Sequence, residues 1–208
     1  DAVKGLRIGA APGPDSTIRQ LFVEARIDLE RDNVNVGPVP GSTGAGVSFG
    51  VNAAKALEDG VIDGFWANAM GVEVAVRKGT GTVVLDARRG ICPPAAVHYT
   101  FPALVTSDAV IERDPESVRA AVRAIVNVQK ALKEDPSRAT EVGEKLFPAM
   151  EAALIAGLIE RDLPFYDPSI SEDKVKGMNG FAMEIGLLTE DVAYDQVVGT
   201  QFSGIWTE

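Results

Sequence analysis

The residues best suited to binding chemistry follow three expected strands in the first third of the chain. The first group occupies residues 12–17, where Pro-Gly-Pro-Asp-Ser-Thr links a strand to a helix start. The free N–H groups of a helix N-terminus attract carboxylates, sulfonates and phosphates, so this turn is a candidate anion site. The alternative is a rigid turn with Ser16 as an ordinary helix cap. The candidate contacts here are Pro12, Gly13, Asp15, Ser16 and Thr17.

A glycine-rich stretch at residues 40–50 follows the second expected strand. Its glycine spacing suggests a dinucleotide-binding loop, but Phe49 stands where the third glycine of G-x-G-x-x-G belongs. The next acid on a strand, Asp63, lies at the strand's start, whereas a ribose-binding acid belongs at its end. The lysine of a P-loop is also missing. No nucleotide cofactor is therefore expected, and the hydroxyls of Ser42 and Thr43 are candidate ligand contacts.

The third group lies at the end of the strand expected over residues 61–66. Trp66 offers an aromatic face on which a flat or cationic ligand can stack. Asn68, two residues later, can fix the orientation of that ligand by hydrogen bonding. The alternative for Trp66 is a packing role beneath a helix, since tryptophan side chains are mostly buried. Ligands of open parallel sheets bind beyond the carboxyl ends of the strands, which is where all three groups fall.

Enzymatic chemistry has little support in the composition. The chain has one cysteine, Cys92, and one histidine, His98, which excludes an intramolecular disulfide, a cysteine cluster and a multi-histidine metal site. A nucleophile would need His98 as its base, and a histidine without acidic neighbours is more often structural. Arg88 and Arg89 are interpreted as a solvated surface pair rather than as an anion clamp. No catalytic residue, metal ion or cofactor is expected.

Length and charge narrow the function further. The chain has 208 residues, of which 46% are hydrophobic and 24% are charged, so a packed globular structure is expected. The formal net charge of −10 repels phosphate backbones and anionic lipid, so nucleic-acid and membrane-surface binding are not expected. No apolar run is long enough to span a bilayer. The first residue is not Met, which fits a processed protein and a fragment equally well.

The order of the expected elements defines the fold class. Short apolar strands alternate with amphipathic helices in the first half, which predicts an α/β fold with a parallel sheet and flanking helices. The second half is mostly helical after one more strand. We therefore expect an α/β lobe over residues 1–98 and a mostly helical region over residues 99–208. The expected strands cover residues 6–10, 34–39, 61–66, 82–86 and 99–106, and the helices between the first four cover about 15–30, 47–58 and 72–77.

Helix signals in the second half are clear. Asp-Pro pairs at residues 114–115 and 135–136 each predict a helix start, and Ser171 predicts another. The first of these helices should bury one face at helical spacing. The expected members of that face are Val118, Ala121, Val122, Ile125, Gln129 and Leu132.

Taken together, these features resemble periplasmic binding proteins of the nitrate, sulfonate and thiamine-precursor class, which have a type II fold. The segment GLRIG at residues 5–9 is similar to the strand that opens the second lobe of this family. The segment ALEDGVIDGFW at residues 56–66 is similar to the approach to the third strand of that lobe. The other similar segments are residues 99–107 and 114–116, Asp135-Pro136, and residues 184–188 with Tyr194 and Phe202.

The resemblance implies two α/β lobes that close on a small-molecule ligand without covalent chemistry. It implies a periplasmic or otherwise extracytoplasmic, membrane-tethered location, and an ABC permease in the inner membrane as partner. Residues 1–98 would be the second lobe, and residues 99–208 the crossover strand and later helices of the first. Most of the first lobe would precede the GLRIG strand, so one cleft wall would be missing. A missing wall predicts an exposed apolar face and homo-oligomerisation.

Two alternatives stay open. Relatives in this family make a thiamine pyrimidine, but Cys92 and His98 alone do not match their cysteine-rich motif and substrate-bearing histidine. A ligand-sensing regulatory domain would bind ligand without a permease. The ligand class is open as well, because Trp66 favours a flat ring while the helix start at Ser16 favours an anion.

Overall fold

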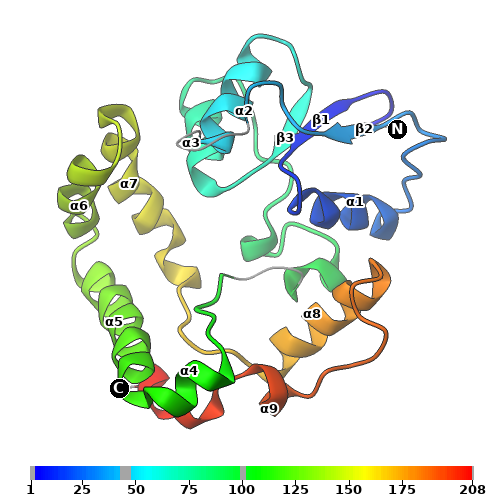
Figure 1. Cartoon of the computed structure of the whole chain (residues 1–208). Coiled ribbons are helices and arrows are strands. Elements are labelled where there is room, and N and C mark those ends of the chain that lie inside the picture. The colour runs from blue at the N-terminus through cyan, green and yellow to red at the C-terminus, as the bar shows by residue number, and fades with distance from the viewer. Residues whose placement is uncertain (1–2, 43–47, 99–101, 208) are drawn as a thin grey trace. The chain divides into compact units, whose positions relative to one another are not determined.

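The computed structural model describes residues 3–42, 48–98 and 102–207. The chain forms two compact units, the first over Asp1–Tyr99 and the second over Thr100–Glu208. The first unit contains the strands, and the described part of the second unit is helical (Figure 1).

The first unit is built on a parallel three-stranded sheet in the order β2-β1-β3. Each strand leads into a helix, which confirms the α/β class with a parallel sheet. The strands are shorter than expected, since only part of each expected segment pairs with a neighbouring strand. The strands are β1 (Arg7–Ala10), β2 (Asn35–Gly37) and β3 (Gly64–Trp66), and the helices are α1 (Asp15–Glu24), α2 (Phe49–Glu58) and α3 (Ala69–Arg77).

The core of the first unit lies between the sheet and its helices. Helix α1 buries Ile18, Leu21 and Phe22, which follow the helical spacing of an amphipathic face. A second cluster joins Val39, after β2, to the small residues of α2 and to the approach to β3. Its buried members are Val39, Ala53, Ala56 and Ile62.

Helix α1 ends at Glu24, six residues before the expected end. Arg26 adopts a left-handed conformation with a φ of 59°. The N–H of Arg26 donates to the carbonyl of Val23 (2.8 Å), and the N–H of Ile27 donates to that of Phe22 (2.8 Å). This pair of hydrogen bonds closes the helix in the Schellman manner. The sequence did not predict this helix end, because the left-handed position that usually holds a glycine is occupied by Arg26.

The fourth expected strand, residues 82–86, is not a strand. Only Asp86 forms a bridge, and its partner is Ile91. The Asp86 carboxylate accepts the N–H of Arg88 (3.1 Å) and caps the short helix η1 (Ala87–Arg89). The apolar segment before it stays exposed, with Val84 79% accessible. Local capping by Asp86 therefore prevails over the β propensity of this segment.

The described part of the second unit is an all-helical arrangement. Residues 102–106, expected as part of a strand, have no regular structure, and residues 99–101 lie outside the described residues. Pro102 and the exposed Val105, 83% accessible, indicate a segment without a paired strand. The α-helices of this unit are α4 (Asp108–Arg113), α5 (Pro115–Glu134), α6 (Arg138–Leu146), α7 (Ala149–Asp162), α8 (Glu172–Glu184) and α9 (Tyr194–Val197).

The helix starts in this unit follow the sequence signals. Asp114 accepts the N–H of Ser117 (3.0 Å) and caps α5, and Ser171 accepts the N–H of Lys174 (3.3 Å) and caps α8. Helix α6 begins two residues later than expected, because the Asp135 carboxylate binds Ser137 in a turn ahead of it.

The expected buried face of α5 is wrong in part. Val118 and Val126 are buried, whereas Ala121 and Ile125 are exposed. The reason is the carboxyl-terminal segment η4 (Thr200–Thr207), whose Phe202 packs on the side of α5 that carries the two valines. Sequence periodicity alone could not distinguish these adjacent apolar stripes.

Candidate functional site

The three parallel strands present their carboxyl ends along one edge of the sheet. Ala10, the last residue of β1, pairs with Trp66, the last residue of β3, and Gly9 pairs with Gly37 of β2. The loops that carry the candidate residues therefore all leave this edge (Figure 1). We call these loops the strand-end loops, with residues 11–14, 38–48 and 67–68.

The first strand-end loop is a tight turn, in which Gly13 has a φ of 93°. The Asp15 carboxylate accepts the N–H of Gly13 (3.0 Å) and pairs with Arg19 (3.1 Å). Ser16 is not the helix cap, since α1 takes Pro14 as its N-cap and no side chain caps it. Thr17 lies on the buried face of α1, and Pro12 and Gly13 form the exposed turn.

The second strand-end loop is described up to Ser42. The Ser42 hydroxyl is buried and donates to the carbonyl of Val39 (2.5 Å). This hydrogen bond closes a turn through Pro40 and Gly41, in which Gly41 has a φ of 72°. Thr43, the other candidate of this loop, lies outside the described residues.

Trp66 and Asn68 frame the third strand-end loop. Trp66 lies at the end of β3 and is half-buried, so it is neither a fully buried core residue nor a fully exposed one. Asn68 is the N-cap of α3, and its side-chain oxygen accepts the N–H of Gly71 (3.4 Å). A capping role for Asn68 was available from the sequence, because an asparagine precedes a helical stretch there.

Gly50, the last glycine of the spacing that suggested a dinucleotide loop, has a packing role, and the glycines at residues 44 and 46 lie outside the described residues. A methyl group at Gly71 would lie 2.5 Å from the Cα of Gly50, so α2 and α3 approach through these two glycines. Gly50 is thus a helix-contact residue inside α2. The close approach holds the starts of both helices at the carboxyl edge of the sheet.

At the opposite edge of the sheet, an ion pair between Arg7 and Asp63 joins β1 to the start of β3. We call it the Arg7–Asp63 staple, and the sequence analysis did not predict it. The Arg7 guanidinium donates to both carboxylate oxygens of Asp63 (2.9 Å each) and to the carbonyl of Gly60 (3.0 Å). The backbone N–H of Arg7 donates to the same carboxylate (2.8 Å). The two residues lie in the two segments that carry the family resemblance. Opposite charges at the starts of two neighbouring strands were the available signal.

The staple predicts a specific loss of stability in acid. Hydrogen bonds from the Arg7 side chain and backbone lower the pKa of Asp63 from 3.8 to about 2, against a smaller effect of burial. A carboxylate with a lowered pKa stabilises the fold fully above its unfolded pKa, and this contribution disappears as the pH falls toward 2. We expect the melting temperature of Asp63→Asn to depend less steeply on pH between 5 and 2 than that of the wild type, by differential scanning calorimetry.

Part of the acid sensitivity will remain in Asp63→Asn. The Arg31 side chain likewise lowers the pKa of Asp32 to about 2, with the Asp28 N–H and Lys4 assisting against burial. Asp32→Asn should therefore flatten the same pH range independently. Parallel melting-temperature profiles for Asp63→Asn and the wild type over this range would contradict the assignment.

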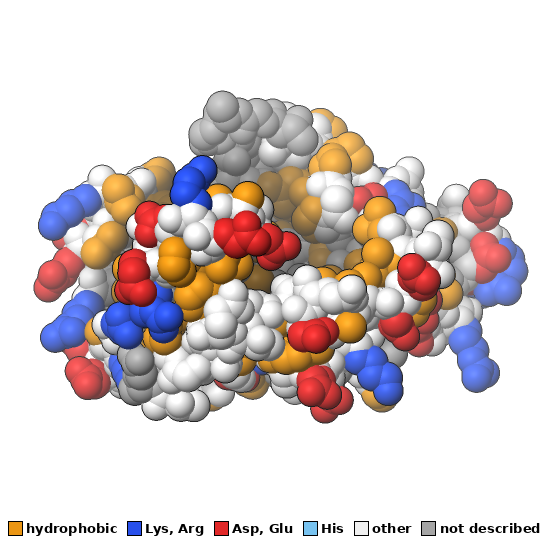
Figure 2. Space-filling model, turned by 60° about the horizontal axis from the view of Figure 1, so that its bottom comes forward, with side chains coloured by type: hydrophobic (Ala, Val, Ile, Leu, Met, Phe, Trp, Pro, Cys, Tyr) orange, Lys and Arg blue, Asp and Glu red, His pale blue; other side chains and the backbone are white. Residues whose placement is uncertain are grey.

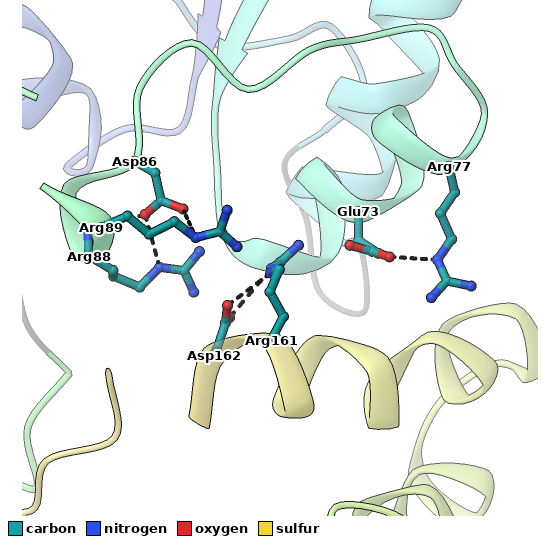
Figure 3. Close-up of polar contacts among 7 residues, drawn as sticks. All are labelled: Glu73, Arg77, Asp86, Arg88, Arg89, Arg161 and Asp162. Atoms are coloured by element: carbon teal, nitrogen blue, oxygen red, sulfur yellow. Dashed lines mark hydrogen bonds and ion pairs between the residues drawn. The ribbon is translucent and has the colours of Figure 1, made fainter. Parts of the chain in front are cut away.

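Each arginine drawn in Figure 3 forms an ion pair with a carboxylate that is close to it in sequence. In the first unit, Arg88 and Arg89 each lie 3.3 Å from Asp86. On α3, Arg77 pairs with Glu73 one turn earlier. In the second unit, Arg161 pairs with the adjacent, buried Asp162 (3.0 Å). These local pairs account for the arginines without an anionic ligand.

The residues considered for catalysis do not form a reactive site. Burial raises the pKa of the half-buried Cys92 thiol, and the nearby Asp86 carboxylate raises it further, so the thiolate is disfavoured. His98 is the last residue of the short helix η2 (Pro94–His98). Within the described residues, no group of three or more His, Cys, Asp or Glu side chains is arranged to hold a metal ion.

Two surface hollows lie away from the strand-end loops. A hollow of about 250 Å³ is lined by residues before β1, at the end of α1 and before β2, including Lys4 and Asp32. Another of about 340 Å³ lies along β2 and includes Arg19. Neither is lined by a candidate ligand residue.

An open parallel sheet whose carboxyl edge carries small, hydroxyl-bearing and aromatic residues is typical of a small-molecule-binding protein. Residues 45–139 match the family model described as NMT1/THI5 like, and this match confirms the resemblance to the nitrate, sulfonate and thiamine-precursor-binding family. The α/β fold is compatible with a type II periplasmic binding fold. No curated protein and no solved structure matched the chain.

The family indicates a substrate-binding role for anions or thiamine precursors. Its members are mostly binding proteins, although THI5 is a synthase, and they are typically extracytoplasmic. None of the described helices is long and apolar enough to cross a membrane.

Proposed function

We propose that this chain is the solute-binding component of an ABC importer, which captures a small organic molecule at the carboxyl edge of its sheet. The observation that carries the proposal is the family match over residues 45–139. This segment includes β3, the starts of α2 and α3, the third strand-end loop and the last residues of the second. The ligand classes that fit the family are a sulfonate, a nitrate-like anion and a thiamine-precursor-like heterocycle.

The proposed ligand contacts are grouped by loop. The first loop offers the exposed turn and the side chain of Asp15. The second offers hydroxyl oxygens, and the third offers the indole ring and the side-chain NH₂ of Asn68. The full set is Pro12, Gly13, Asp15, Ser16, Thr17, Ser42, Thr43, Trp66 and Asn68.

The raised pKa of the Cys92 thiol favours a binding function over a catalytic one. A nucleophilic cysteine needs a lowered pKa, whereas burial and the Asp86 carboxylate raise the pKa of this thiol. We therefore propose a receptor without covalent chemistry rather than a synthase-like enzyme. A ligand-sensing regulatory domain would share this site, and the presence of a permease gene beside the coding sequence would separate the two.

The proposed partner is an inner-membrane permease, and the proposed location is the periplasm. No continuous basic patch is visible on the face shown in Figure 2, where acidic and basic side chains are interspersed, consistent with a partner other than nucleic acid. Hydrophobic side chains are exposed between them. Leu146 and Leu187, 71% and 74% accessible, support the further proposal of self-association.

The test is native mass spectrometry of gently purified protein, followed by a thermal-shift screen against a broad metabolite panel. The proposal predicts one ligand per chain, released on denaturation or found by a saturable rise in melting temperature. The same spectra report the oligomeric state. An empty protein that no member of the panel stabilises would contradict the proposal.

A further inference from the structure

The hollow near the starts of β1 and β2 is lined by an excess of positive charge. It measures about 250 Å³ and lies between the segment before β1, the end of α1 and the segment before β2. Three of its lining side chains are cationic, those of Lys4, Arg26 and Arg31, and one is anionic, that of Asp32. The lining therefore carries a net charge of +2, in a chain whose net charge is −10.

Asp32 holds two of these cations at the hollow. Its carboxylate is buried and lies 2.8 Å from Nη2 of Arg31 and 3.5 Å from Nζ of Lys4. The hydrogen bond from Arg31 is the main cause that lowers the pKa of Asp32 to about 2, with the N–H of Asp28 assisting against burial. The carboxylate is thus ionised at neutral pH and positions Lys4 and Arg31 permanently.

Arg26 is the uncommitted cation of the hollow. It is exposed, and among the residues that the structure describes its guanidinium has no hydrogen-bond or ion-pair partner. Its φ of 59° is a conformation that costs energy for any residue with a side chain, and glycine usually takes this position after a helix. A strained cation in place of glycine indicates that the side chain has a role of its own.

The helix dipole offers the simplest role for this arginine, because a cation at the end of α1 is stabilised there. That role needs only one charge, and it does not account for the two further cations that line the same hollow. The two roles also differ in what they predict. A dipole partner contributes to the stability of the protein alone, whereas a ligand contact contributes to the affinity for an anion.

The other carboxylates of the loop between α1 and β2 do not line this hollow. The Asp28 carboxylate accepts the N–H groups of Glu30 (3.1 Å) and Arg31 (2.9 Å) within its own loop. Glu30 lines the separate hollow along β2. An anion in the first hollow would therefore meet one carboxylate, that of Asp32, which already accepts several donors.

The size and the charge of the hollow define the class of anion. Its volume is below the roughly 300–1,000 Å³ of sites that enclose drug-sized ligands, so a small ion or a single phosphoryl group fits better. Arginine and lysine bind the oxygens of such groups through charge-assisted hydrogen bonds. A lining charge of +2 balances a dianion, whereas a monoanion leaves it half neutralised.

We propose that this hollow is a second, peripheral site for a divalent tetrahedral oxyanion, with the chemistry shared by phosphate, sulfate and a terminal phosphoryl group. The Arg26 guanidinium donates to the anion, and Lys4 and Arg31, held by Asp32, supply the remaining positive charge. The site lies at the edge of the sheet opposite the strand-end loops, so it is independent of the proposed receptor function.

The test is calorimetric titration of the full chain at pH 8, where inorganic phosphate is mostly a dianion. The probes are inorganic phosphate, methyl phosphate and sulfate, with nitrate and acetate as monovalent controls at equal ionic strength. We expect saturable binding of one dianion per chain, at least about fivefold tighter than that of the monovalent ions. Amide chemical shifts in the phosphate titration should be concentrated in residues 3–5, 25–28 and 31–33.

A matched pair of variants separates a ligand contact from general electrostatics. Arg26→Asn removes the cation, and asparagine tolerates the left-handed conformation, so the variant should keep the melting temperature of the ligand-free protein. It should weaken phosphate binding by at least about fivefold. Arg113→Asn makes the same change at the end of α4, in the second unit, and should leave the phosphate affinity unchanged.

Each outcome decides for or against the site. Phosphate that binds no more tightly than nitrate overturns it, as does an unchanged phosphate affinity in Arg26→Asn; a lower melting temperature in that case assigns Arg26 to the helix dipole. Tighter binding of methyl phosphate than of inorganic phosphate supports the site and assigns it to phosphoryl groups, and the reverse order supports it and assigns it to the free ion. The receptor function is tested separately, because a ligand of the strand-end loops should bind Arg26→Asn and the wild type equally.

Discussion

Phe202→Ala should lower the free energy of unfolding of the second unit by about 3–5 kcal/mol, the usual cost of removing a buried phenylalanine ring. Phe202 is 4% accessible and packs with Val118, Val126 and Ile205, so it joins η4 to α5. The guanidinium carbon of Arg119 also lies 5.5 Å from the centre of its ring. Loss of the ring removes both the apolar packing and this cation–π contact.

The measurement is urea denaturation followed by Trp206 fluorescence in a Trp66→Phe background, so that the signal reports the second unit. Phe147→Ala is the matched control, because Phe147 lies in the same unit and is 48% accessible. It should cost about 1 kcal/mol or less. Equal losses for the two variants would show that η4 does not anchor α5.

Gly71→Ala should destabilise the first unit by about 1–3 kcal/mol. The added methyl group would lie within 2.5–2.6 Å of backbone atoms of Gly50, and a backbone cannot rotate away as a side chain can. Helices α2 and α3 would have to separate, which disturbs the two helix starts at the carboxyl edge. Urea denaturation followed by Trp66 fluorescence, with Trp206→Phe, measures the loss.

Gly180→Ala gives the opposite expectation for the same chemical change. Gly180 lies inside α8, and no heavy atom lies within 4 Å of a methyl group built there. Alanine is the better helix former, so this variant should be up to about 1 kcal/mol more stable. A destabilised Gly180→Ala, or a neutral Gly71→Ala, would contradict the packing explanation for the glycines.

Local rules predicted most of the helices and the first three strands. Asp114 and Ser171 cap α5 and α8 as their positions predict, because capping depends only on neighbours in the chain. The strand expected at residues 82–86 and the described part, residues 102–106, of the strand expected at 99–106 are not strands, because a strand also needs a partner, which propensity does not supply. The buried face of α5 depends on η4, which lies far away in sequence.

The candidate site divides in the same way. The parallel order of the strands follows from the alternation of strands and helices, so the placement of Trp66 and Asn68 at one edge was predictable. The sequence could not predict that the first N–H groups of α1 donate to carbonyls of the preceding turn, because this depends on the backbone conformation of Pro14. The Arg7–Asp63 staple needed the strand register to be known.

The central claim is that the carboxyl edge of the sheet is the ligand site, and amide chemical shifts test it most directly. The chain is labelled with ¹⁵N and titrated with a ligand found by mass spectrometry or by the thermal-shift screen. The account predicts saturable shifts concentrated in residues 13–17, 41–50 and 66–71. Shifts concentrated instead around Lys4 and Asp32, in the hollow at the opposite edge, would contradict it.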